Sequence, residues 1–81
     1  MNATRTISAI ATEIKADWKN VYFGAVPYLD AMLQLSTMDQ NFGCDPAKEI
    51  VMYFLANANA WRGPKAREVK AELKNMLKRA T

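Results

Sequence analysis

Apolar side chains recur at helical spacing through residues 45 to 79, and the pair Gly63-Pro64 divides that stretch in two. Glycine enters the left-handed conformation that ends a helix without a steric penalty, and proline suits the first helical position. The sequence therefore predicts a helix from about residue 46 to 62, a tight glycine corner at Gly63, and a second helix from 64 to about 79.

The first of these two helices carries a core face. Asp45 is its expected N-cap and Pro46 its expected first residue. The core face is shared by Ile50, Val51, Phe54, Ala58 and Trp61. Asn57 lies on the same face, where an unpaired amide costs free energy. We expect it to hydrogen-bond to the backbone of a neighbouring segment, and a contact with a ligand is the alternative.

Another helix is expected near the N-terminus, after a short frayed tail. Its N-cap is Thr4 or Thr6, and it runs to about Asn20. Apolar residues recur along it at helical steps: Ile7, Ile10, Ala11, Ile14, Trp18 and Val21. This stripe predicts one buried face.

The segment from 21 to 26 is apolar, but a lone strand there would have no partner, so we expect a packed connector. Pro27 then begins a helix that ends between residues 35 and 38. The stretch from 36 to 44 is a predicted loop, and its Phe42 is expected to fold back onto the core.

Together these segments predict an all-α fold, a compact four-helix domain that is either a bundle or an orthogonal array. All 81 residues are expected to form this single domain, and a hydrophobic content of 51% is enough for a core. No apolar run approaches the ~20 residues of a membrane span. The N-terminus lacks the hydrophobic region of a secretory signal, so a cytoplasmic protein with no membrane association is expected.

Histidine is absent and cysteine occurs once, as Cys44. This excludes histidine-based catalytic triads, zinc sites of the usual Cys/His kinds and an internal disulfide. Glu13 and Asp17 share a helix face, but we interpret them as solvated charges. The isolated glycines form no phosphate-binding loop. We expect no enzymatic activity, no cofactor and no metal.

The net charge of +3 is distributed unevenly. Residues 62 to 79 hold seven bases and two acids, whereas the remainder holds four bases and six acids. Four of the bases fall within about 80° on the last helix: Arg67, Lys70, Lys74 and Lys78. Such a face is typical of a solvated helix, of a protein-binding surface or of a nucleic-acid-binding surface. All three interpretations remain open.

Met52 lies on the back of the helix that precedes Gly63, together with Ala56 and Ala60. Small and flexible apolar side chains of this kind are covered either by another helix of the same fold or by a partner. If the back is exposed, it is a candidate interface, and a homodimer is one way to cover it.

Four segments of the chain resemble a group of known proteins: WKNVYFGAVPYLDAM at residues 18 to 32, YFL at 53 to 55, WRG at 61 to 63 and AR at 66 to 67. The group consists of short proteins of unassigned function encoded by bacteriophages, prophages and other mobile elements of Gram-positive gut bacteria. The resemblance implies a genomic context in which many small proteins act by binding a host protein. Inhibitors of defence nucleases, such as anti-CRISPR proteins, are among them. The positive net charge departs from the acidic inhibitors that mimic DNA.

The sequence thus favours a non-enzymatic protein-binding module of a phage or mobile element, with a host defence protein as one possible target. The alternative is a small nucleic-acid-binding accessory protein that uses the basic face of the last helix. The predicted partner-binding residues are Trp61, Arg62, Arg67, Lys70, Lys74 and Met52.

Overall fold

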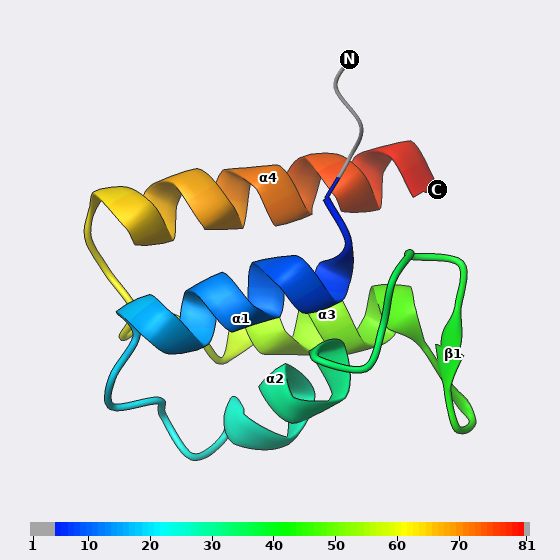
Figure 1. Cartoon of the computed structure of the whole chain (residues 1–81), viewed down its shortest axis with the longest axis horizontal. Helices are drawn as coiled ribbons and strands as arrows, with labels where there is room; N and C mark the ends of the chain where they lie inside the picture. Colours follow the sequence, from blue (N-terminus) through cyan, green and yellow to red (C-terminus); the bar gives the residue numbers. More distant parts are fainter. Residues whose placement is uncertain (1–4, 81) are drawn as a thin grey trace.

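Three helices, α1 (Ile7–Asp17), α3 (Ala47–Ala56) and α4 (Pro64–Ala80), extend along the molecule in the computed structural model, which describes residues 5–80. Helix α4 runs antiparallel to α1 and α3, and the short helix α2 (Val26–Met32) lies on the other side of these two helices (Figure 1). The predicted four-helix fold is confirmed, with one addition. A small two-stranded hairpin precedes α3.

Helix α1 begins as expected, because the Oγ1 of Thr6 accepts a hydrogen bond of 3.1 Å from the amide of Ala9. The predicted stripe is buried from Ile7 to Ile14. The helix ends at Asp17 rather than Asn20, because the backbone of Trp18 is extended and carries its ring into the core. Thr4, the alternative N-cap, and the expected tail before Arg5 lie outside the described residues.

Residues 21 to 25 form no strand, which confirms that this segment is a connector, with a turn at residues 23 to 25. The expectation that it packs is wrong for Tyr22 and Phe23, which are exposed, whereas Ala25 is buried. Pro27 lies in the first turn of α2, as expected. The helix ends at Met32, earlier than predicted, because the amides of Gln34 and Leu35 bond to carbonyls three residues back and tighten the chain into a turn. The carbonyls of Leu35 and Ser36 then accept from the first amides of α1.

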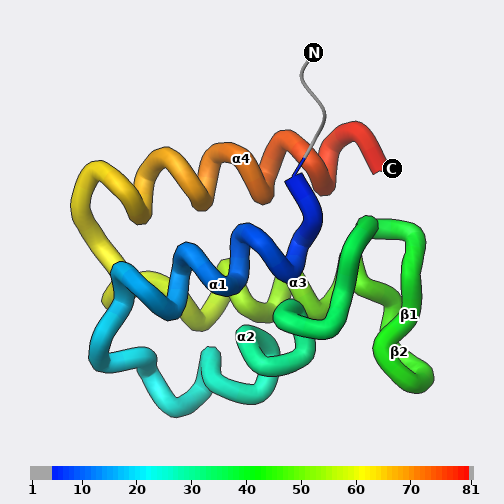
Figure 2. Tube along the Cα trace, viewed as in Figure 1, coloured from blue at the N-terminus to red at the C-terminus, as the bar shows by residue number. Residues whose placement is uncertain are grey.

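The hairpin lies within the segment that we expected to be a loop. Strands β1 (Asn41–Phe42) and β2 (Asp45–Pro46) pair antiparallel, with Phe42 opposite Asp45 (Figure 2). Gly43 has a φ of +64°, and a glycine with positive φ at the first central position is the requirement of a type II′ hairpin turn. Two predictions are therefore wrong: Asp45 does not cap α3, and Phe42 stays exposed. The N-cap is Pro46, which the sequence analysis placed inside the helix.

Helix α3 ends at Ala56, six residues before the predicted end at Arg62. Asn57 is the C-cap and donates its Nδ2–H to the carbonyl of Tyr53 at 2.8 Å. Its amide is thus half-buried and bonded to its own helix, not to a neighbouring segment as expected. Asparagine side chains compete with the helical backbone in this way, which favours a helix end.

The tight glycine corner is therefore replaced by a link of seven residues, 57 to 63. Gly63 does not end α3. Its carbonyl accepts from the amide of Arg67 at 3.0 Å, so it belongs to the start of α4. Its φ of +112° is a conformation that glycine adopts without strain. Helix α4 itself is as predicted to within one residue.

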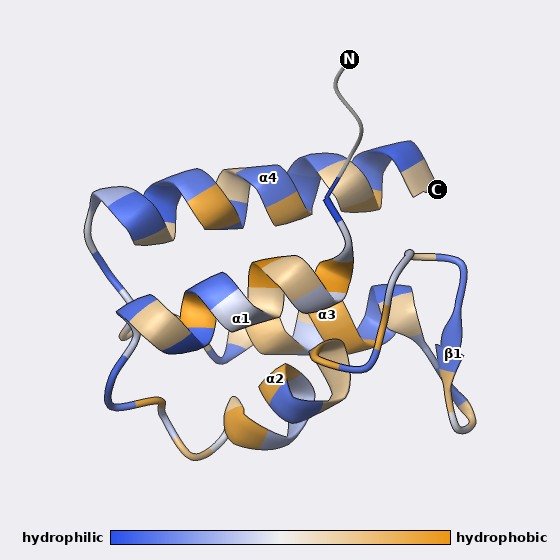
Figure 3. Ribbon diagram, viewed as in Figure 1, coloured by the Kyte–Doolittle hydropathy of each residue, from blue (hydrophilic) through white to orange (hydrophobic). Residues whose placement is uncertain are grey.

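The core is formed by the faces that the periodicity indicated. Phe54 lies at 0% exposure, and α4 contributes Ala66, Val69, Leu73 and Met76. Figure 3 shows the hydrophobic residues of α4 on the side toward α1 and the hydrophilic ones on the outer side. The sequence pattern also predicts an inward Ala80, and this prediction is wrong because Ala80 is exposed. Within residues 5–80, no helix is both long and apolar enough to cross a membrane.

Candidate interaction surfaces

Trp61 was predicted to bind a partner, but the structure buries it to 2% exposure. Its ring stacks on Trp18 with centroids 5.9 Å apart and planes 10° from parallel. Its Nε1–H donates to the Oδ2 of Asp17 at 2.8 Å. Trp61 therefore joins the link 57 to 63 to the end of α1, and its ring does not form part of the surface.

Lys70 has a structural role as well. Its Nζ donates to the carbonyl of Ala58 at 2.8 Å and to that of Trp61 at 2.7 Å, and it lies 5.9 Å from the Trp61 ring centroid. Burial lowers the pKa of this amine, and the charges of Lys74 and Arg62 lower it further. Lys70 thus joins α4 to two carbonyls of the link 57 to 63.

The remaining basic candidates, Arg62, Arg67 and Lys74, are exposed. Within residues 5–80, none of the three side chains has a hydrogen bond or ion pair. Helix α4 is on the side of the molecule away from α2 (Figure 1). Arg67 and Lys74 carry positive charge on α4, and Arg62 lies just before it. Their role as contacts stays a prediction.

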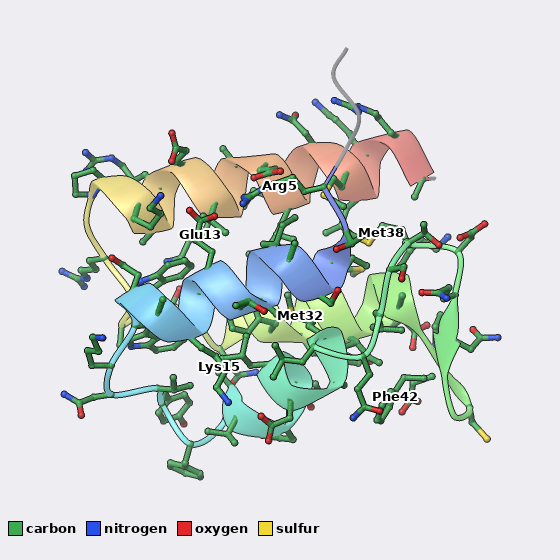
Figure 4. All side chains as sticks on the ribbon, in the orientation of Figure 1. Arg5, Glu13, Lys15, Met32, Met38 and Phe42 are labelled. Atoms are coloured by element: carbon green, nitrogen blue, oxygen red, sulfur yellow. The ribbon has the colours of Figure 1, made fainter. Side chains whose placement is uncertain are left out.

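A cluster of ion pairs joins the chain before α1 to α1 and α4. Arg5 binds Glu72 through Nη2 at 2.6 Å and Nε at 3.1 Å, and Glu13 through Nη1 at 2.7 Å. Lys65 reaches the other oxygen of Glu13 at 2.6 Å. Figure 4 shows Arg5 and Glu13 between α1 and α4. The expectation that Glu13 and Asp17 are merely solvated is therefore wrong.

We expect Glu13→Gln to lower the free energy of unfolding by about 1 kcal/mol at neutral pH, the upper range for partly exposed pairs. Hydrogen bonds from Lys65 and then Arg5 lower the pKa of Glu13 below its ordinary value of 4.5. A lowered folded-state pKa gives stability that is present above the unfolded-state pKa and is lost as the pH falls through the folded-state pKa.

Urea unfolding of the wild type and of Glu13→Gln between pH 7 and pH 3 measures this loss of stability. The difference in their free energies of unfolding should shrink as the pH falls. Asp30→Asn is the control, because the Lys15–Asp30 pair is long, at 3.7 Å, and exposed. If the two free energies of unfolding differ as much at pH 3 as at pH 7, the ionised carboxylate of Glu13 is not the source of the stability.

Met52 lies on the surface as predicted, 54% exposed, and it belongs to a larger apolar area. We define the aromatic face by its exposed large side chains and one half-buried ring: Tyr22, Phe23, Phe42, Met52, Tyr53 and Tyr28. Phe23 is the most exposed, at 79%. Met52 is the one member of this set that the sequence predicted to bind a partner. The others come from the connector, α2, the hairpin and α3, and the fold brings them near it.

Two pockets lie along this face. One is lined by Tyr22, Ala56, Asn57, Asn59 and Ala60, and the other lies between α2, the hairpin and α3. Tyr53 lines the second pocket, and Ala56 and Asn57, three and four positions later, line the first. Residues at this spacing occupy one side of a helix, so the exposed side of α3 connects the two pockets.

The structure brings no metal-binding constellation together: residues 5–80 hold no group of three or more His, Cys, Asp or Glu side chains that could bind an ion. Cys44 is exposed in the hairpin turn. Comparison of the chain with protein-family models, with curated proteins and with solved structures finds no match.

Proposed function

We propose that this protein is a non-enzymatic binding module that acts on another protein through its aromatic face. The observation that carries the proposal is the exposure of six large apolar side chains on one small domain, five of which belong to the aromatic face. Large exposed apolar patches mark protein interaction sites, and aromatic residues and methionine are enriched at interface cores.

The resemblance to small phage and mobile-element proteins supports a host protein as the target, with a component of host defence as the specific proposal. The module would then act in the cytoplasm, where such targets are found. A protein that inhibits its target by covering the target's working surface needs a binding surface but no catalytic site.

The test is capture from a lysate of a Gram-positive gut bacterium, followed by binding measurements with the purified partner. We expect Phe23→Glu/Met52→Glu to weaken binding by at least about 30-fold, the effect of losing a binding hot spot. Both positions are exposed, so circular dichroism should show an intact fold. Ala71→Glu/Asn75→Glu is the matched control, because it also introduces two glutamates at exposed sites and lies outside both the aromatic face and the predicted contacts. Equal binding by the aromatic-face variant and the wild type would contradict the proposal.

Nucleic-acid binding is the second candidate, favoured by the unpaired charges of Arg62, Arg67 and Lys74. Three phosphate contacts predict a slope near −3 in log affinity against log salt, from about −0.9 per contact on duplex DNA. A titration of duplex and single-stranded DNA at low salt tests it. No binding to either would eliminate this candidate.

A further inference from the structure

The pocket between α2, the hairpin and α3 has a volume of about 340 Å³ and an unusual lining. Its walls contain three aromatic rings, one carboxylate and a set of aliphatic residues: Tyr28, Phe42, Tyr53, Asp45, Pro27, Ala31 and Ile50. Ala31 and Ile50 are buried and form its apolar base. Asp45 is the only charged residue of this lining.

The three rings come from three different elements. Tyr28 of α2 and Tyr53 of α3 have centroids 5.5 Å apart and planes inclined by 41°, so they do not stack flat on each other. Phe42 comes from β1 and lies on the side of the hairpin toward α2 (Figure 4). Aromatic faces attract cations through their quadrupole, and arginine makes such contacts more often than lysine.

Asp45 supplies the complementary charge. It lies opposite Phe42 in the hairpin, so the type II′ turn places a ring and a carboxylate at the same edge of the pocket. Within residues 5–80 its side chain has no hydrogen bond and no ion pair. A carboxylate beside apolar rings favours a cation that can both stack and donate hydrogen bonds, and the guanidinium group does both.

The charge of the surrounding segment has the same sign as Asp45. Residues 21 to 60 hold four acids, Asp30, Asp39, Asp45 and Glu49, against the single base Lys48. Asp30 is paired with Lys15 of α1 at 3.7 Å, and with this base included the net charge is −2. This contrasts with the basic segment from 61 to 80, which holds seven bases and two acids. The field around the pocket therefore steers cationic segments toward it and disfavours anionic ones.

We propose that this pocket binds an arginine side chain from a basic segment of the partner protein, which rests on the proposed protein-binding function. The guanidinium plane lies against Tyr28, Tyr53 and Phe42, and its N–H groups donate to the carboxylate of Asp45. The aliphatic stem of the arginine covers the apolar base. The inference thus assigns a chemical class to the partner's contact residue.

The test is an NMR titration of the full-length, ¹⁵N-labelled protein with the peptide acetyl-Gly-Arg-Gly-amide. The matched probe is the same peptide with citrulline, which has the shape of arginine without its charge. We expect saturable shifts at the amides of Tyr28, Phe42 and Tyr53, and about tenfold weaker binding of the citrulline peptide. Asp45→Asn should weaken arginine binding to the same extent. Asp39→Asn, the same change outside the pocket lining, should leave it unaltered.

Equal affinity for both peptides, unchanged binding by Asp45→Asn, or shifts confined to α4 would overturn the inference. A second copy is the other possible occupant. If sedimentation shows a dimer that Asp45→Asn dissociates, the pocket serves self-association and the inference is wrong. The capture experiment uses Phe23 and Met52, which lie outside this pocket lining. If Phe23→Glu/Met52→Glu loses the partner but the wild type does not bind the arginine peptide, this inference alone is wrong and the proposed function stands.

Discussion

Replacing Trp61 by alanine should lower the free energy of unfolding by about 3–5 kcal/mol, the usual cost of deleting a buried aromatic side chain. The ring is 2% exposed and stacks on Trp18, so the deletion leaves a cavity between the link 57 to 63 and α1. The Oδ2 of Asp17 loses its donor, and the Nζ of Lys70 loses the ring beside it. Since small domains are stable by about 5–15 kcal/mol, the change removes a large share of the total.

Urea denaturation followed by circular dichroism measures this loss. Arg62→Ala is the control, because Arg62 is the exposed neighbour in the chain and should change stability by no more than about 0.5 kcal/mol. Trp61→Phe keeps an aromatic ring and removes the N–H, so its loss should be smaller, about 1–2 kcal/mol. If Trp61→Ala unfolds at the wild-type urea concentration, the tryptophan is not a core residue and its predicted role as a surface contact regains support.

Leu73→Ala is the second large expected loss, about 2–5 kcal/mol. Leu73 is completely buried in the middle of α4, where it faces α1 and α3 with Val69 and Met76. Shortening the side chain opens a cavity in the layer that holds α4 on the rest of the fold. The following residue, Lys74, is exposed, and Lys74→Ala should change the free energy of unfolding by about 0.5 kcal/mol or less.

Thermal and urea unfolding of this pair of neighbours tests which side of α4 is buried. The same comparison decides whether the basic side is free for a partner. Equal losses for both variants would mean that α4 is rotated or detached, and the basic surface described for Arg67 and Lys74 would then be wrong.

The helices with strong periodicity were predictable. In α1 and α4, apolar residues at steps of three and four determine which side is buried, whatever the helix packs against. Local chemistry also indicated where two helices begin, through the N-cap Thr6 of α1 and through Pro27 in the first turn of α2. These features depend only on neighbours within a few positions, so the sequence contains them directly.

The end of α3 was not predictable in the same way. The periodicity of Ile50, Phe54 and Trp61 continues through the real helix end, so it predicted six residues too many. Tertiary contacts decide the end. The Trp61 ring stacks on Trp18, and Lys70 of α4 donates to the carbonyls of Ala58 and Trp61 in the link that follows α3. Asn57 was a local signal for a stop, but it was interpreted as a buried core amide.

The candidate pocket was still less predictable from the sequence than the end of α3. Its hairpin has strands of two residues, too short for a periodic pattern, and only the turn formers Asn41 and Gly43 indicated a turn. Phe42 and Asp45 meet Tyr28 and Tyr53 because three elements converge.

By itself, the sequence determined that the chain forms four helices, which of their sides are apolar, and that charge is concentrated on the last helix. The tertiary structure alone decided which exposed groups gather into a surface and which predicted contacts are structural. The physical reason is the distance along the chain over which each interaction acts. Helical periodicity acts over one or two turns, whereas the positions of Trp61, Lys70 and Asp45 depend on residues that are distant in the chain.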